Sequence, residues 1–345
     1  MHNDTRIAVD LAKSVFEIGV SSQPGKVSRR LRVTREKFLP TMAQLPQGTV
    51  IMEACGSAHY WARENQKLGH SVVLLPAQHV KPYVLRDKTD RMDVNGLLEA
   101  SRNENIRPVP IKSPEQQLLA SLHRLRSAWM GDRTARLNTL RGLLRERGVF
   151  IPVGAEHVVP HVWAAIEDAD SAIPDALRLL FSEACQEIRD FERRIKDCER
   201  QLEALAKQMP DVQRLLTIPG IGLITATALV AFVGDIRRFP SSRHFASYLG
   251  IVPRERSSAL IRRLGGISKR GDIYIRMLLI HGARSVLRAA QTQKRPDRLR
   301  AWALRLRDHQ CYNKAAVALA NKLARIVWAV WRQPEATFIS VPHAG

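Results

Sequence analysis

Four carboxylates near the start of the chain have the spacing and setting of a metal site. Asp90 and Asp93 lie three residues apart in the helical pattern DKTDRMDVNGLLEA, so they share one face of a helix. Asp10 lies in the β-branched run RIAVDLA, and Glu53 lies at the end of the buried run GTVIMEACG. If the two strands end side by side and the helix crosses them, all four carboxylates converge.

Converging carboxylates repel one another unless protons or a cation neutralise them. Ligands that are all oxygen favour Mg²⁺ or Mn²⁺ over zinc. Two such ions about 3.5–4 Å apart could activate an attacking oxygen and stabilise the leaving oxygen of a phosphodiester. The alternative is that Asp93 is a solvated helix residue, with Asp87 as a competing acid. The neighbouring cations Arg86, Lys88 and Arg91 are expected to face a DNA backbone.

The charge of the chain indicates a polyanionic partner. It carries 54 Lys and Arg against 33 Asp and Glu, a net charge of +21, and nucleic acid is the commonest polyanion. An anionic membrane is the rival, but no run reaches the length of a spanning helix and the N-terminus has no secretory pattern. Four scattered cysteines without a CxxC pair suggest a reducing compartment. We therefore expect a cytoplasmic, nucleoid-associated protein without a membrane partner.

The order of elements predicts an α/β first domain over residues 1–112. Three strand signals follow one another in RIAVDLA, SVFEIGVS and KVSRRLRV. Six elements come next: a helix with a possible kink at Pro40, a buried strand, a helix capped by Ser57, another strand, the acidic helix and a short edge strand RPVPI. A meander followed by strand–helix alternation is the order of a ribonuclease-H-like sheet.

Residues 113–210 change to helical periodicity. Leu118, Leu122, Leu125 and Trp129 fall at helical spacing, and a second long helix without Pro or Gly starts near residue 175. Such a pair predicts a coiled-coil linker. The pattern leaves open whether the helices pair within one chain or between two chains.

The third domain is expected over 211–333, with a flexible tail at 334–345. The segment TIPGIGLITATALVA resembles a helix-hairpin-helix, in which Gly220 and Gly222 permit a tight turn and the following helix N-terminus can hold a DNA phosphate. A plain helical turn is the alternative. Further on, a loop rich in Arg, Ser and Gly precedes helices to about residue 333.

Several of these segments, in order through nearly the whole chain, resemble one family. They are similar to segments of the transposases of the insertion sequence one-ten family, in its eleven-eleven group. The segments are IAVDLAKSVFEIGV, MEACGSAHYWARE, VKPYVLRDKTDRMDVNGLLEA, TIPGIGLITATALVA and LGIVPRERSSALIRRLGGISKRGD. The resemblance implies a RuvC-like N-terminal domain and a C-terminal transposase domain that carries a nucleophilic serine. It assigns the acidic DEDD tetrad to Asp10, Glu53, Asp90 and Asp93.

The resemblance places the nucleophile in PRERSSAL. Family members often have a glycine after the serine, and this chain has Ala259, so the register leaves Ser257 and Ser258 open, with Ser258 preferred. A serine hydroxyl needs activation, which metal ions on the tetrad could supply. Six cations near the serines could clamp phosphates: Arg254, Arg256, Arg262, Arg263, Lys269 and Arg270. The alternatives are a nonspecific basic patch and serines that only contact phosphates or cap a helix.

The resemblance also implies the partners. A structured bridge RNA from the element pairs with donor and target DNA, and homodimers on each DNA join into a synaptic homotetramer. The implied reaction is RNA-guided cutting and rejoining through a phosphoserine. The tetrad alone would also suit a RuvC-type junction nuclease that uses water. The charge and the helix-hairpin-helix would suffice for a non-catalytic nucleic-acid-binding scaffold.

Overall fold

The computed structural model describes residues 5–84, 89–258 and 261–341 and divides the chain into two compact units. They are Met1–Ser113 and Pro114–Gly345, so the division falls one residue after the boundary expected from the sequence. Arg86, Lys88 and Asp87 lie outside the described residues. No helix within the described ranges is long and apolar enough to cross a membrane.

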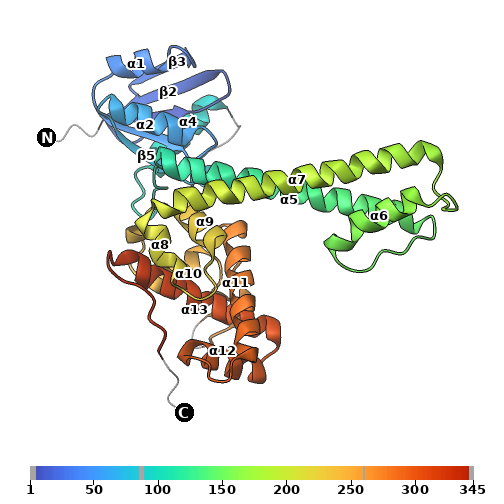
Figure 1. Cartoon of the computed structure of the whole chain (residues 1–345). Helices are drawn as coiled ribbons and strands as arrows, with labels where there is room; N and C mark the ends of the chain where they lie inside the picture. Colours follow the sequence, from blue (N-terminus) through green and yellow to red (C-terminus); the bar gives the residue numbers. More distant parts are fainter. Residues whose placement is uncertain (1–4, 85–88, 259–260, 342–345) are drawn as a thin grey trace. The chain divides into compact units, whose positions relative to one another are not determined.

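The first unit is a five-stranded mixed sheet with helices packed against it (Figure 1). Its strands, in spatial order, are β3 (Arg29–Thr34), β2 (Val15–Ser21), β1 (Arg6–Asp10), β4 (Thr49–Glu53) and β5 (Ser71–Leu75). Its helices are α1 (Phe38–Gln44), α2 (Ala58–Lys67), α3 (Ala77–Val80), a 3-10 helix (Lys81–Tyr83) and α4 (Asp90–Ala100). β1, β2 and β3 form an antiparallel meander, and β4 and β5 run parallel to β1. The predicted mixed α/β unit is confirmed.

Alternating residues of β1 build two cores, one on each face of the sheet. Ile7 and Val9 are fully buried with Trp61 of α2 in one core. Ala8 points the other way and is buried with Leu97 of α4. Because successive side chains of a strand point to opposite faces, this five-residue strand contributes to both cores.

Two local predictions in this unit are wrong. The expected edge strand at RPVPI is only a single bridge, in which the Val109 N–H donates to the Leu74 carbonyl over 2.8 Å. Pro108 and Pro110 have no N–H to extend a ladder. Pro40 falls in the first turn of α1, where a missing N–H leaves no helical hydrogen bond unmade, so it gives no kink.

The second unit begins with two long helices that pair within the chain. They are α5 (Pro114–Arg145) and α7 (Asp175–Lys207), joined through a 3-10 helix (Ala155–His157) and α6 (Val158–Glu167) at the far end of the pair (Figure 1). Ion pairs link the two helices in antiparallel register: Arg126 with Glu199, Arg133 with Glu192, and Arg136 with Glu187. Of the two pairings that the sequence left open, the structure has the one within a single chain.

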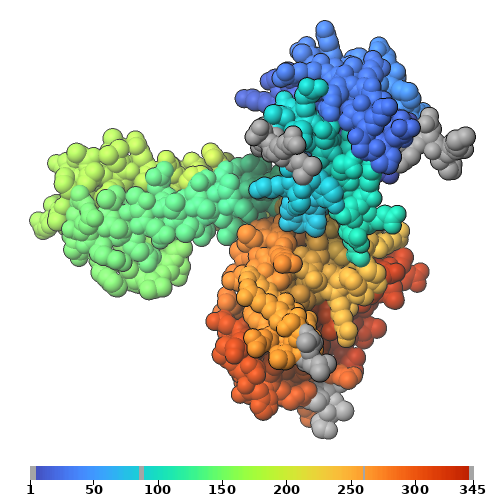
Figure 2. Space-filling view, turned by 180° about the vertical axis from the view of Figure 1, so that it is seen from behind, coloured from blue at the N-terminus to red at the C-terminus, as the bar shows by residue number. Residues whose placement is uncertain are grey.

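The rest of the second unit is a helical body from which the α5–α7 pair extends (Figure 2). Its elements are α8 (Pro210–Leu216), α9 (Leu223–Val233), a 3-10 helix (Ile236–Arg238), α10 (Ser242–Tyr248), β6 (Pro253–Glu255), β7 (Leu264–Ile267), α11 (Ile273–Thr292), α12 (Arg298–His309) and α13 (Tyr312–Arg332). One core joins these helices through fully buried residues such as Leu229, Phe245, Leu279 and Leu323.

A buried histidine connects α5, α9 and α11. His123 Nδ1 lies 3.0 Å from the Tyr274 hydroxyl, and its Nε2 lies 3.0 Å from Thr227 Oγ1. Because the Thr227 hydroxyl donates to the Leu223 carbonyl, the histidine Nε2–H donates to Thr227 and Nδ1 accepts from Tyr274. A neutral ring satisfies both contacts. Burial, and then the charge of Arg126, lowers the pKa of His123 to about 4.

The C-terminal segment after α13 contacts the helical body, although we expected a flexible tail from residue 334. The Phe338 N–H donates to Thr217 Oγ1 over 2.9 Å. The Ser340 hydroxyl donates to Asp297, and the Val341 carbonyl accepts from the Arg298 N–H. These hydrogen bonds hold residues 338–341 against α8 and the start of α12.

Candidate active site

The register of the sheet brings Asp10 and Glu53 together. β1 and β4 are parallel neighbours in which Val9 pairs with Met52. Asp10 and Glu53 are the next residues along, at the carboxyl ends of the two strands. Both side chains are partly exposed, so the predicted pair of strand-end acids lies at one accessible edge of the sheet.

α4 supplies the other two acids from its first turn. The Thr89 hydroxyl caps the helix by accepting from the Met92 N–H, which places Asp90 and Asp93 directly after the cap. The helix packs closely on β2 because Gly19 has no side chain there. An added Cβ at Gly19 would come within 2.4 Å of Val94 Cγ1. The missing side chain therefore lets the acidic turn approach the strand ends.

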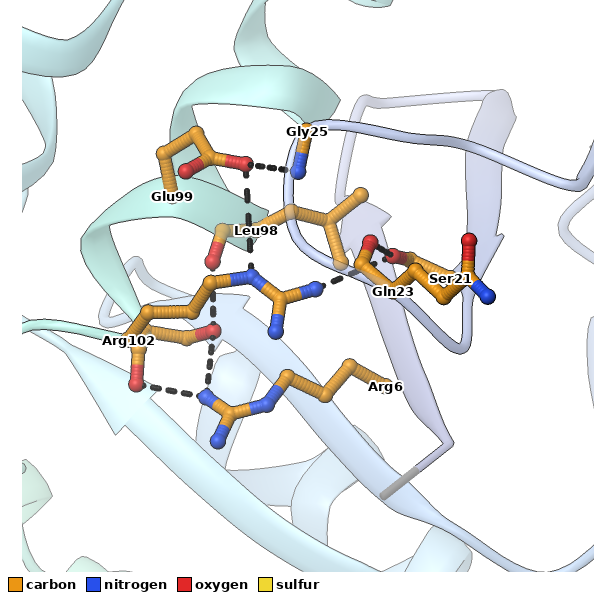
Figure 3. Close-up of polar contacts among 8 residues, drawn as sticks. Arg6, Ser21, Gln23, Gly25, Leu98, Glu99 and Arg102 are labelled. Atoms are coloured by element: carbon orange, nitrogen blue, oxygen red, sulfur yellow. Dashed lines mark hydrogen bonds and ion pairs between the residues drawn. The ribbon is translucent and has the colours of Figure 1, made fainter. Parts of the chain in front are cut away.

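Polar contacts fix the opposite end of α4 (Figure 3). Arg6, at the start of β1, donates to the Ser101 carbonyl over 2.7 Å and to its hydroxyl over 3.0 Å. Arg102 donates to the Ser21 hydroxyl over 3.0 Å. Glu99 accepts from the Gly25 N–H over 3.1 Å. With its last turn held at the start of β1, α4 packs along β1 and β2.

The electrostatics of Asp10 report this convergence. Burial, followed by the charges of Asp93, Asp90, Glu53 and Glu17, raises the pKa of Asp10 to about 6. The charges of the other three predicted acids thus all act on Asp10.

Glu17 is a fifth acid that the sequence analysis did not single out. It pairs directly with Asp10 across β1 and β2, so the two side chains share one face of the sheet. Only about 8% of Glu17 is exposed. Its neighbours in SVFEIGVS are apolar, and the pairing of Glu17 with Asp10 becomes visible only in the register of the meander.

The donor set suits a divalent cation in its chemistry. It consists of carboxylate oxygens, and a cation would offset the burial and the repulsion that together raise the pKa of Asp10. Over the described ranges, however, no three His, Cys, Asp or Glu side chains stand in an arrangement that could hold a metal ion. The carboxylates would therefore have to turn toward one another to coordinate an ion.

Cations surround the acidic turn. Arg91 is exposed, and Arg32 Nη2 lies 3.9 Å from Asp90 Oδ2. A surface pair at that distance contributes little to stability. Both guanidinium groups are accessible to a phosphate that approaches the site.

The predicted serine loop of the second unit is a β-hairpin. β6 and β7 are antiparallel, with Pro253 opposite Ile267 and Glu255 opposite Leu264. A further bridge between Ser258 and Ile261 extends the pairing to the tip. The six predicted phosphate-binding cations, Arg254, Arg256, Arg262, Arg263, Lys269 and Arg270, are all exposed. The serines therefore lie near the tip of a basic hairpin.

The two serines have different surroundings. The Ser257 hydroxyl donates to Glu255 Oε1 over 2.8 Å and accepts from the Arg263 N–H over 3.2 Å. Arg262 in turn lies 3.3 Å from Glu255. Among the described residues, the hydroxyl of Ser258 has no hydrogen-bond partner, and the residue is exposed. Ser257 thus stabilises the hairpin internally, and Ser258 presents its hydroxyl to solvent.

The foot of the hairpin is held by close backbone contacts. Gly250 has φ +71°, and an added Cβ would come within 1.8 Å of the Arg270 carbonyl oxygen. Lys269 has φ 55°, an unusual value for a residue with a side chain, and its N–H donates to the Gly250 carbonyl over 3.0 Å. These contacts connect the hairpin to the end of α10.

The predicted glycine turn joins α8 and α9. Gly220 has φ +81° and packs against α11, where an added Cβ at Gly282 would come within 2.0 Å of the Gly220 carbonyl oxygen. Gly222 is exposed and precedes the first residue of α9, with its carbonyl accepting from the Ala226 N–H. Phosphate binding at this turn stays a prediction.

Comparison with known proteins identifies the family. Residues 212–298 match the family described as Transposase IS116/IS110/IS902, and residues 7–148 match the DEDD transposase domain of IS110. The chain is 44% identical over 330 residues to a probable family 20 transposase of Pseudomonas aeruginosa, covering 95% of this chain and 97% of that protein. The chain belongs to the IS110 family of transposases.

Two further relatives of this transposase span nearly its whole length. The transposase for insertion sequence element IS1111A of Coxiella burnetii is 38% identical over 95% of this chain and 90% of its own. The pilin gene-inverting protein of Moraxella lacunata is 24% identical over 95% of this chain and 96% of its own. Membership implies an enzyme of DNA transposition that binds, cuts and rejoins DNA.

Proposed function

We propose that this transposase is an RNA-guided DNA recombinase that cuts and rejoins donor and target DNA through a phosphoserine. The observation that carries the proposal is the pair of specialised sites in one chain. One is a set of carboxylates whose charges act on Asp10, and the other is an exposed serine near the tip of a basic hairpin.

The proposed fold of the first unit is ribonuclease-H-like, of the RuvC type. The strand order β3-β2-β1-β4-β5, with β4 and β5 parallel to β1, supports it. In this proposal Asp10, Glu53, Asp90 and Asp93 hold Mg²⁺ or Mn²⁺. When bound, the ions supply charge stabilisation for the phosphodiester and favour the ionised form of the attacking hydroxyl.

The chemical step assigns the nucleophile to Ser258. Its Oγ forms a bond to phosphorus while the bond from phosphorus to one DNA oxygen breaks. A carboxylate of the acidic site accepts the serine proton, and the departing DNA oxygen takes up a proton. The phosphoserine conserves the bond, so a DNA hydroxyl can later attack it and release Ser258. Arg254 and Arg256 are suited to hold the phosphate oxygens during both steps.

The proposed partners follow from the charge and the two sites. A surplus of +21 supports binding of donor and target DNA and of a structured bridge RNA. The turn at Gly220 and Gly222 is proposed as a helix-hairpin-helix that contacts phosphate. Because the acids and the serine belong to separate units, we propose that a homodimer on each DNA, joined into a homotetramer, brings acids and serines together.

The test is covalent trapping of DNA. The full chain is incubated with Mg²⁺, end-labelled donor and target DNA, and RNA transcribed from the element's non-coding end, and then analysed under denaturing conditions. We expect a protein–DNA adduct that Ser258→Ala and Asp10→Asn abolish. Ser247→Ala, a change at an exposed serine outside the hairpin, serves as the control. Omission of the RNA tests guidance, since recombination that persists without it removes the RNA from the proposal.

Ser257→Ala separates the two serines. If Ser257 only stabilises the hairpin, this variant weakens the adduct without abolishing it. Complete loss of the adduct in this variant, with a normal adduct in Ser258→Ala, reassigns the nucleophile to Ser257 with Glu255 as its base. An adduct that survives the double substitution shows the covalent mechanism to be wrong.

A water-using junction nuclease of the RuvC type is the second candidate. It is favoured by the location of all the interacting carboxylates within the first unit. This enzyme would give metal-dependent cleavage with free DNA ends and no adduct. If neither adduct nor metal-dependent cleavage appears, the protein acts as a binding scaffold.

A further inference from the structure

A groove in the second unit, beside the serine hairpin, has the dimensions of a polymer-binding site. It encloses about 1400 Å³ between one face of α13, strand β7 and Trp302 of α12. Small-molecule pockets usually enclose about 300–1,000 Å³. The groove is therefore large enough for several units of a chain molecule.

The groove combines an apolar floor with cationic edges. Ile251, Val317 and Ile326 line its floor. Gly265 and Gly266 form part of the β7 wall, and both are exposed. An added Cβ at Gly266 would meet nothing within 4 Å, so the backbone there is open to a ligand.

Three cations line the groove: Lys314, Lys322 and Arg325. Over the described residues, none of the three is paired with a carboxylate, and the groove lining contains no Asp or Glu. The sequence of α13, residues 312–332, also contains no acid. A polyanion therefore meets attraction from this helix without a competing carboxylate.

Lys322 lies where the cations and the apolar surface meet. Its Nζ is 4.0 Å from the centroid of the Trp302 ring. Burial, and then the charges of Arg298, Arg325 and Arg305, lowers the pKa of Lys322. Phosphate groups at the edge of the groove would offset this repulsion among cations.

We propose that the groove holds an unpaired DNA strand, with bases over the apolar floor and phosphates on Lys314 and Arg325. Duplex DNA keeps its base faces stacked inside, whereas a single strand offers them to apolar and aromatic side chains. The choice of DNA rests on the proposed function, because β7 belongs to the hairpin that carries Ser258. A strand opened at the cut phosphodiester would lie beside this wall.

The test measures binding by the full chain. Fluorescence anisotropy uses a labelled thymidine oligonucleotide of about 12 residues, a ribouridine oligonucleotide of the same length and a DNA duplex. One variant combines Lys314→Gln with Arg325→Gln. Its control combines Arg194→Gln with Lys196→Gln, which removes the same charge from exposed positions on α7. Gly266→Phe fills the groove without a change in charge.

We expect the Lys314 and Arg325 variant to reduce the magnitude of the log–log salt slope for the thymidine strand by about 1.4, since each lost phosphate contact contributes about 0.7. The control pair leaves the slope unchanged. Gly266→Phe weakens binding of the thymidine strand about tenfold without changing the slope, and duplex binding stays the same.

Four binding results would overturn the proposal. The first is an equal change of the salt slope in the groove variant and in the control variant, and the second is unchanged binding of the thymidine strand by Gly266→Phe. The third is an equal loss of affinity for duplex and single strand, and the fourth is a loss of affinity for the ribouridine strand alone. A change of oligomeric state in Gly266→Phe, seen by sedimentation, would assign the groove to a second copy of the chain and also overturn it. Covalent trapping with Ser258→Ala tests the proposed function separately, so either proposal can fail without the other.

Discussion

Replacing Asp10 by Asn should stabilise the metal-free first unit. Burial and the acids around it raise the pKa of Asp10 from 3.8 to about 6. Between these values the native state binds more protons than the unfolded state, so stability is lost as pH rises through this window. Above it, the ionised carboxylate destabilises the fold, and an amide of the same shape removes that charge.

The size of the effect follows from the pKa. A change from 3.8 to about 6 corresponds to about 3 kcal/mol if no solvent screens the charges. Asp10 is partly exposed, and screening reduces charge interactions at such positions to about 1 kcal/mol. One kcal/mol changes an opening equilibrium about fivefold.

Hydrogen–deuterium exchange of β1 and β4 measures this opening directly. With divalent ions chelated, Asp10→Asn should slow exchange of these strands about fivefold at pH 8 and have a much smaller effect near pH 4. Glu36→Gln, at an exposed acid of the same unit, should leave exchange unchanged at both pH values. If Asp10→Asn exchanges as fast as the wild type at pH 8, or faster, the carboxylates do not repel as described and the reasoning fails.

Two further predictions concern the second unit. His123 has a pKa of about 4 in the native state. As pH falls from about 6.5 to 4, the unfolded state therefore binds a proton that the native state does not bind, and the native state loses stability. Denaturant unfolding should show that the free energy of unfolding falls by up to about 3 kcal/mol over that window. His123→Gln should remove this dependence on pH, and a dependence that persists in the variant contradicts the assignment. Gly250→Ala should destabilise the foot of the hairpin by about 3 kcal/mol, because φ is +71° and the new Cβ would lie 1.8 Å from the Arg270 carbonyl oxygen. Hydrogen–deuterium exchange over residues 264–271 measures this loss of stability, with Gly266→Ala as a control whose new Cβ meets no neighbour within 4 Å. Equal exchange rates in the two variants would refute the prediction.

The positions of the four acids on their strands and helix were largely predictable because each acid has a strong local signal. Asp10 and Glu53 come at the ends of apolar β-branched runs, and Asp90 and Asp93 follow the cap of a helix. Parallel neighbouring strands end at the same edge of a sheet, so secondary structure alone nearly determines their meeting.

Features that depend on pairing between distant residues were harder to predict. Glu17 becomes part of the site only through its antiparallel partner Asp10. The serine hairpin was interpreted as a loop because its strands have three and four residues and almost no buried side chains. No apolar alternation marks such strands. The expected strand at RPVPI failed for the opposite reason, since β propensity was present but two prolines removed the donors.

The ion pairs between α5 and α7 also restrict how this family can change in length. Arg126 and Arg133 lie seven residues apart on α5, and their partners Glu199 and Glu192 lie seven residues apart on α7, so a step along one helix is matched by a step back along the other. An insertion in α5 alone would shift every later pair out of register. Homologues with a longer or shorter arm should therefore differ by compensating insertions or deletions in both helices, in multiples close to seven residues.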